Sequence, residues 1–122
     1  MITIEALRKL LFSFPEVEEA PHFEKISFQV KKKIFVTYSH SNHIITLKLS
    51  LEEQDVFSSG KDNAIFPVPN AWGKQGWTVV DLSIVHEDLF HDAITTAYSN
   101  VAPKKLAEKI KTNSQFRTNR NY

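Results

Sequence analysis

Apolar side chains near the start of the chain recur at the spacing of a helix. This set comprises Ile4, Leu7, Leu10, Leu11 and Phe14. Thr3 is placed to cap the N-terminus of such a helix. Pro15 ends it, because a proline ring disfavours helical backbone in the residue before it. The pattern therefore predicts a first helix that buries one face.

The pattern then changes to alternation of apolar and polar residues. Residues 25–30 and 43–50 show it, and residues 34–39 between them are rich in the β-branched and aromatic residues typical of strands. The connections between them, 31–33 and 40–42, are too short for a crossover, so the three strands form an antiparallel meander. The acidic segment that precedes them and ends at Pro21 is predicted to be a connection without a strand.

The second half of the chain repeats the mixture of helix and strand. Ser50 and Glu53 have the spacing of a capping box for a helix that Gly60 ends. Residues 64–68 are predicted to be an edge strand because their proline removes a ladder donor. A strand over 77–83 follows, and then a helix over about 86–102 with Ser83 as its cap.

This order of elements predicts an α+β domain with two layers, in which helices cover one face of a five-stranded antiparallel sheet. The length of 122 residues suits a single domain, placed at residues 1–110. Residues 111–122 have few apolar side chains and are predicted to be a basic, disordered tail.

Charge is unevenly distributed along the chain. Residues 1–102 carry nine Lys/Arg and thirteen Asp/Glu, whereas residues 103–122 carry six Lys/Arg and one Glu. The absence of cysteine excludes disulfides, thiolate metal sites and thiol catalysis. The N-terminal residues lack the order of a signal peptide, and no apolar run reaches the ~20 residues that span a bilayer. We expect a cytoplasmic protein that does not contact membranes.

Motifs of the common enzyme classes are missing from the sequence. There is no glycine-rich phosphate loop and no nucleophile elbow, so we expect no catalytic residues and no cofactor. His40 and His43 flank a turn without a nearby carboxylate, which favours polar turn residues over a metal site. The acids at 16, 18, 19 and 24 could hold a hard cation, but a solvated acidic loop is the expectation.

Lysines and aromatic residues are the remaining candidates for a site. Lys31, Lys32 and Lys33 occupy a hairpin turn, where they either contact phosphates or keep the turn soluble. Trp72, Lys74 and Gln75 lie in the segment "NAWGKQGW", which is predicted to be a mobile loop with an exposed Trp72. Two further sets are Lys104 and Lys105, and a surface pocket lined by His22, Trp77 and Tyr98.

Several stretches of the chain resemble the MmcQ/YjbR family in order and spacing. They are "FPEVEEAPHFEKISFQV", "KIFVTYS", "LKLSLEEQ", "FPVPNAWGKQGWTVVDL" and "AYSNVAPKKLA". The resemblance covers about residues 1–110 and departs mildly at Phe23, where the family often has Trp and where we expect unchanged packing. It implies a CyaY-like (frataxin-like) fold and a DNA-binding protein similar to a double-wing module.

Three functions are therefore open at this point. The first is nucleic-acid binding, with DNA as partner, lysines on phosphates, Gln75 at a base edge and Trp72 stacked on a base. The second is a non-catalytic domain that binds a small molecule or another protein. The third, drawn from the frataxin-like fold, is iron binding by surface acids, for which fold analogy is a weak warrant. A monomer is expected.

Overall fold

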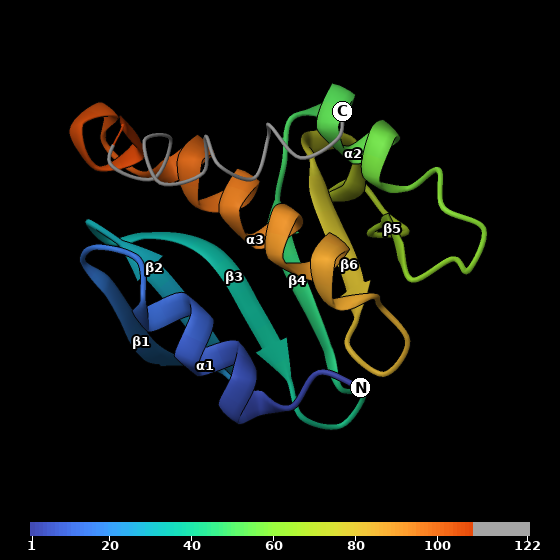
Figure 1. Cartoon of the computed structure of the whole chain (residues 1–122), viewed down its shortest axis with the longest axis horizontal. Helices are drawn as coiled ribbons and strands as arrows, with labels where there is room; N and C mark the ends of the chain where they lie inside the picture. Colours follow the sequence, from blue (N-terminus) through green and yellow to red (C-terminus); the bar gives the residue numbers. More distant parts are fainter. Residues whose placement is uncertain (109–122) are drawn as a thin grey trace.

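The chain folds into one antiparallel sheet with helices on one side (Figure 1). The structure is a computed structural model that describes residues 1–108. In chain order the elements are α1 (Ile4–Phe12), β1 (Val17–His22), β2 (Lys25–Val30), β3 (Lys33–Ser39), β4 (Ile44–Lys48), α2 (Leu51–Phe57), β5 (Ile65–Pro67), the 3₁₀ turn η1 (Gly73–Gln75), β6 (Trp77–Asp81) and α3 (Glu87–Val101). The predicted tail, 111–122, lies outside the described residues.

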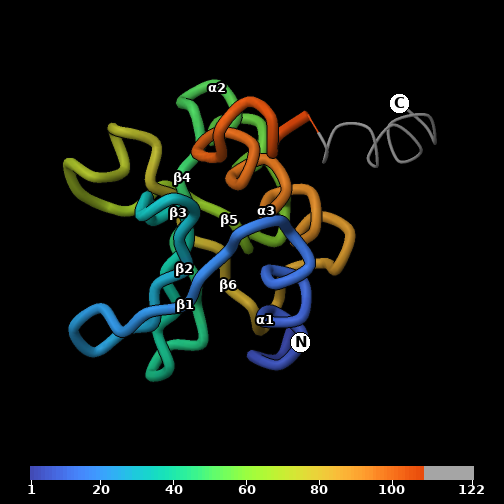
Figure 2. Tube along the Cα trace, turned by 90° about the vertical axis from the view of Figure 1, so that its left-hand side faces the viewer, coloured from blue at the N-terminus to red at the C-terminus, as the bar shows by residue number. Residues whose placement is uncertain are grey.

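The sheet has six strands in the order β1-β2-β3-β4-β6-β5, and each neighbouring pair is antiparallel. Helices α1 and α3 lie on one face, and no helix of the described residues covers the other, as the edge-on view in Figure 2 shows. We call the uncovered side the open face. The predicted α+β class with an antiparallel sheet is confirmed, and the predicted count of five strands is wrong.

The additional strand is β1, where a connection was expected. Its residues pair with β2 along their whole length, from Val17 opposite Val30 to His22 opposite Lys25. Acidic residues are tolerated because β1 is an edge strand and Glu19 has a cationic partner. Glu19 accepts two hydrogen bonds of 2.9 Å from Arg8 on α1. The pairing with Glu19 raises the pKa of Arg8. Arg8 is distant from Glu19 in the sequence, so the local pattern of residues 17–22 did not indicate a strand.

The core fills the space between the sheet and the helices. Its fully buried side chains include Leu7 and Leu11 of α1, Phe28 and Leu47 of the sheet, and Ile94 of α3. Polar residues alternate with the apolar ones along the strands, so the polar set lies on the open face. Stability thus comes from one side of the sheet, and the opposite side is available for other contacts.

The helix ends follow the sequence signals with two exceptions. Thr3 caps α1, and Ser50 and Glu53 form the predicted capping box of α2. The N-cap of α3 is His86 in place of Ser83, since the side chain of His86 accepts from the N–H of Asp88 at 3.2 Å. The helix α2 ends at Phe57 with Ser58 as its cap, before Gly60 is reached.

His43 has a structural role in the turn between β3 and β4. Its Nε2 lies 2.6 Å from the carbonyl oxygen of Ile2, and its Nδ1 lies 2.9 Å from the hydroxyl of Tyr38. A carbonyl only accepts, so Nε2 carries the proton and Nδ1 accepts from Tyr38. The imidazole thereby fastens the N-terminal segment to the sheet.

Candidate functional site

The connection between β5 and β6, residues 68–76, is held in place by hydrogen bonds to its surroundings. The N–H of Val68 donates to the carbonyl of Trp77, and the N–H of Leu49 donates to the carbonyl of Gly76. Lys48 donates from Nζ to the carbonyl of Gln75. We name residues 68–76 the platform, because these bonds give it a defined place beside the sheet where a mobile loop was expected.

Two glycines allow the platform to approach the sheet. Gly76 has a φ of 104°, which residues with a Cβ rarely adopt, and a Cβ there would lie 1.9 Å from the carbonyl oxygen of Leu49. A Cβ on Gly73 would lie 1.9 Å from the carbonyl oxygen of Val68. Close backbone contacts therefore require glycine at both ends of the segment "GKQG".

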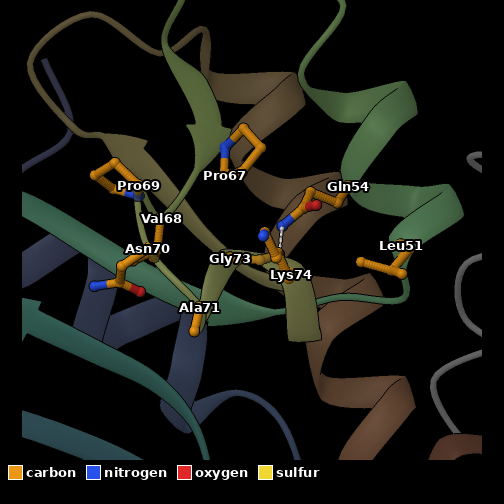
Figure 3. Close-up of a pocket in the computed structure, with 9 residues that line it drawn as sticks. All are labelled: Leu51, Gln54, Pro67, Val68, Pro69, Asn70, Ala71, Gly73 and Lys74. Atoms are coloured by element: carbon orange, nitrogen blue, oxygen red, sulfur yellow. Dashed lines mark hydrogen bonds between the residues drawn. The ribbon is translucent and has the colours of Figure 1, made fainter.

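Gln54 of α2 fixes the platform from its other side (Figure 3). This buried amide donates to the carbonyls of Gly73 and Trp77, at 2.9 and 3.1 Å, and lies 3.1 Å from the hydroxyl of Thr78. Leu51, Gln54 and part of the platform line an open pocket of about 720 Å³. Figure 3 shows Pro67, Val68 and Pro69 forming the wall opposite α2.

A second pocket, of about 450 Å³, lies on the open face, and we name it the open-face pocket. Its lining comes from four strands, the platform and the end of β1, and comprises His22, Lys25, Ile34, Thr37, Thr46, Val68, Asn70, Trp72 and Trp77. The pairing of Thr37 with Thr46 across β3 and β4 places both threonines at its floor. Figure 2 shows two segments projecting on this side of the sheet, the β1–β2 turn and the platform.

Aromatic surface is concentrated around the open-face pocket. Trp72 is 58% exposed, as the sequence predicted. Burying this indole in the core would have removed a large apolar area from water. Trp77 is half-buried, and the Nζ of Lys48 lies 5.6 Å from the centre of its ring. This distance permits a cation–π contact with Trp77, which also lines the pocket. An exposed indole, a second indole and an ammonium group therefore lie together.

Phe23 occupies the tip of the β1–β2 turn and is 95% exposed. The expectation that this aromatic residue packs in the protein is wrong. Its φ of 60° is in the left-handed region, which a bulky residue rarely adopts. A two-residue turn with positive φ at its first position normally has glycine there. The chain thus presents an aromatic ring to solvent at a position where glycine would be more stable.

Polar groups of the open-face pocket retain hydrogen-bonding capacity. The hydroxyls of Thr37 and Thr46 lie 2.6 Å apart and share one hydrogen bond, which leaves one of their two hydrogens for another acceptor. The side-chain oxygen of Asn70 accepts from the N–H of Trp72 at 2.8 Å. Its amide N–H groups have no partner among residues 1–108. A ligand in the pocket would therefore meet donors above a polar floor.

The lysines nominated from the sequence lie mostly at one end of the sheet. β3 begins at Lys33, its neighbour β4 ends at Lys48 and β6 begins at Trp77, so antiparallel pairing brings these three residues to the same end. We name it the lysine end. In Figure 1, α3 runs toward the β2–β3 turn. Lys104 and Lys105 follow α3 in the chain and are exposed. Lys74 is exposed on the platform.

The turn of Lys31, Lys32 and Lys33 has a strained backbone and one internal partner. Lys31 and Lys32 have φ values of 50° and 68°. Lys31 also pairs with Glu16 at 2.6 Å, so Glu16 offsets part of the charge of the turn. Both central positions of a tight turn with positive φ favour Asn or Gly. Lysine at both positions gives exposed charge in place of the most stable turn.

The residues predicted to form a pocket are only partly brought together. His22 and Trp77 line the open-face pocket, in the company of Trp72. Tyr98 does not, because it is fully buried between α3 and the sheet and donates its hydroxyl to the carbonyl of Pro15 at 2.8 Å. Its place in the apolar stripe of α3, four residues after Ile94, was the sequence signal for the core.

Sequence reasoning missed other residues of the site, namely Phe23, Lys25, Thr37, Thr46, Lys48 and Asn70. The threonines and lysines occupy the polar positions of alternating strands, which is the signal that would have assigned them to one face. Which of these side chains contact one another depends on the register between strands.

Within residues 1–108 there is no group of three His, Cys, Asp or Glu side chains placed to hold a metal ion. No helix in this range is both long and apolar enough to cross a membrane.

Comparison with known proteins agrees with this architecture. The crystal structure of Deinococcus radiodurans protein DR2400, with its DUF419 domain, superposes with a TM-score of 0.74 at 20% identity, covering 91% of this chain and 89% of that chain. At this identity the likeness shows the fold alone. No curated protein matches the chain. The YjbR family model matches residues 12–100, which include β1, the platform and most of α3. The chain therefore belongs to the YjbR family.

Proposed function

We propose that this protein is a non-catalytic nucleic-acid-binding protein, with DNA as its ligand. The observation that carries the proposal is the exposed Trp72 on a platform fixed by hydrogen bonds, close to the cations of the lysine end. Aromatic side chains and positive charge are the two features with which proteins hold the bases and the backbone of nucleic acids. Here Trp72 and Lys25 line the open-face pocket, and the lysine end borders the platform.

In this proposal the lysines and the platform have separate roles. Lys74 and the turn of Lys31, Lys32 and Lys33 contact phosphates, with Lys104 and Lys105 extending the charged edge. Such contacts provide affinity that falls as salt rises, because each one releases condensed counterions. Gln75 is exposed next to Lys74 and reaches a base edge, while Trp72 stacks on a base. The acidic charge of residues 1–102 restricts binding to this edge.

Fluorescence anisotropy with a labelled DNA oligonucleotide tests the proposal. Binding of the full chain at low salt is compared with the variants Lys74→Ala and Lys9→Ala. Both lysines are exposed, but Lys9 lies on α1 on the covered side of the sheet. Lys74→Ala should weaken binding and lower the slope of log K against log salt by about 1. Equal losses in the two variants, or no binding at micromolar protein, would refute the proposal.

A second candidate function is suggested by the open-face pocket alone. A volume of about 450 Å³ is within the range of small-molecule sites. Binding of a free metabolite there would raise the melting temperature of the protein, and Trp77→Ala would abolish that increase. A panel of metabolites measured by thermal shift tests it, and a panel without any shift would count against it.

A further inference from the structure

We propose that the preferred ligand is single-stranded nucleic acid, with one unpaired base inserted into the open-face pocket and stacked on Trp72. This inference rests on the proposed function and adds the form of the ligand. Four features of the described residues support it: the shape of the pocket, its aromatic walls, its free hydrogen-bonding groups and its flanking cations.

The shape of the pocket favours an unpaired base. The platform and the β1–β2 turn both project on the open face (Figure 2), so the threonine floor lies in a recess between two projections. A duplex keeps its bases stacked inside two backbones, and proteins reach a whole base only after it leaves the stack. An unpaired base can enter such a recess, whereas a duplex would meet only the projections.

The aromatic walls provide stacking surfaces for more than one base. Trp72 is 58% exposed at the pocket, and Phe23 is 95% exposed at the tip of the opposite projection. Neither side chain contributes to the core, and Phe23 in addition has a left-handed backbone. Backbone strain of this kind costs on the order of 1–3 kcal/mol and is concentrated at functional sites. Stacking of one base on each ring would explain why both aromatic side chains are exposed.

The polar groups of the pocket are placed to contact the inserted base. One hydroxyl hydrogen of the Thr37–Thr46 pair and the amide N–H groups of Asn70 have no partner among residues 1–108. Unpaired bases offer oxygen and nitrogen acceptors on their Watson–Crick edges. Donors at the floor and wall of the pocket can therefore pair with that edge, while the ring stacks on Trp72.

Cations border the pocket where the backbone of a strand would leave it. Lys25 lines the side toward β1, and Lys48 lies over Trp77 on the side toward the platform. Phosphates on either side of the inserted nucleotide would thus meet an ammonium group. Glu24, adjacent in the turn, carries the opposing charge, so the path of the strand is limited to the lysine side.

Anisotropy titrations with a labelled single strand of thymidines, with the matching duplex and with a thymidine mononucleotide as competitor provide the test. The variants are Trp72→Leu, Phe23→Leu and, as a control, Phe12→Leu. Phe12 is also an exposed aromatic residue, at 49%, but it lies on α1. Leucine keeps an apolar side chain at each position, so the comparison isolates the aromatic ring.

We expect the single strand to bind at least tenfold more tightly than the duplex at equal salt. Stacking contributes about 1–3 kcal/mol per base, so Trp72→Leu should weaken the single strand about 5- to 150-fold. Phe23→Leu should weaken it in the same direction, and Phe12→Leu should leave it within about twofold. Thermal unfolding of each variant confirms folding, which these exposed positions should preserve.

The outcomes separate this inference from the proposed function. If neither DNA form binds, the proposed function fails. If the duplex binds as tightly as the single strand, or if Trp72→Leu binds like the unmodified protein, nucleic-acid binding stands and the single-strand inference is overturned. A mononucleotide that competes as well as the oligomer would also overturn it, because the pocket would then be a site for free nucleotides.

Discussion

Replacing Gly76 with alanine should destabilise the protein more than the addition of a single methyl group suggests. Gly76 has a φ of 104°, and an alanine Cβ would lie 1.9 Å from the carbonyl oxygen of Leu49. Real Cβ atoms do not approach oxygen that closely, so the backbone of Leu49 or of the platform must move. The contact at risk is the 2.9 Å hydrogen bond from the N–H of Leu49 to the carbonyl of Gly76.

The size of the effect follows from two costs. A left-handed backbone costs a residue with a Cβ roughly 1–2 kcal/mol. Loss of the Leu49–Gly76 hydrogen bond costs about 1 kcal/mol more, and more again if the N–H stays buried without a partner. The free energy of unfolding should therefore fall by about 2–4 kcal/mol. For a domain of this length that corresponds to a melting temperature lower by roughly 10 °C.

Urea unfolding followed by tryptophan fluorescence measures this loss, since Trp72 and Trp77 flank the glycine. Gly60→Ala is the matched control, because its new Cβ would be 3.4 Å from the nearest atom, Oδ1 of Asp62, which is ordinary contact. That variant should stay within about 0.5 kcal/mol of the unmodified protein. If Gly76→Ala lost less than about 1 kcal/mol relative to Gly60→Ala, the close packing of the platform on β4 would be refuted.

Three further predictions concern other parts of the molecule. Gln54→Glu would place a carboxylate against the carbonyls of Gly73 and Trp77, so it should cost about 1–3 kcal/mol at pH 7 in urea titrations and regain part of that at pH 4, where the carboxyl is protonated. Lys32→Gly should raise the free energy of unfolding by about 0.5–1 kcal/mol, because Lys32 has a φ of 68°, which glycine adopts without strain. A lower free energy of unfolding would contradict this turn geometry. Burial, aided by Glu16, raises the pKa of Tyr98 above its ordinary 10.0. The unfolded chain then loses this proton first, so the unfolding free energy should fall as pH rises through 10, and Tyr98→Phe should show a smaller decline in a pH series of thermal melts.

Local signals in the sequence were sufficient for most of the elements. Thr3 and the Ser50–Glu53 box place two helix starts, because a cap depends on residues only three positions apart. The alternation in β2 and β4, and the β-branched and aromatic residues of β3, likewise indicated strands. β1 was missed because its acids are balanced by residues distant in sequence, as in the pair of Arg8 and Glu19. Its register with β2, and not its own composition, makes it a strand.

The candidate site depended on information of longer range. Exposure of Trp72 followed from its place in the loop before Trp77, so a local argument sufficed. The meeting of Thr37 with Thr46 depends on the register of β3 and β4, and the contact of Lys48 with Trp77 depends on that of β4 and β6. Exposure of Phe23 required knowledge that His22 and Lys25 pair across a two-residue turn. Tyr98 was misassigned because an aromatic residue suits either a pocket or a core.

The separation of the core from the open face has a consequence for how such proteins diversify. The side chains that hold α1 and α3 against the sheet are not those that line the open-face pocket. Substitutions at Thr37, Thr46 or Lys25 can therefore change what is bound with little loss of stability. A library that varies only these positions should yield mostly folded variants, which makes this face suited to selection for new ligands.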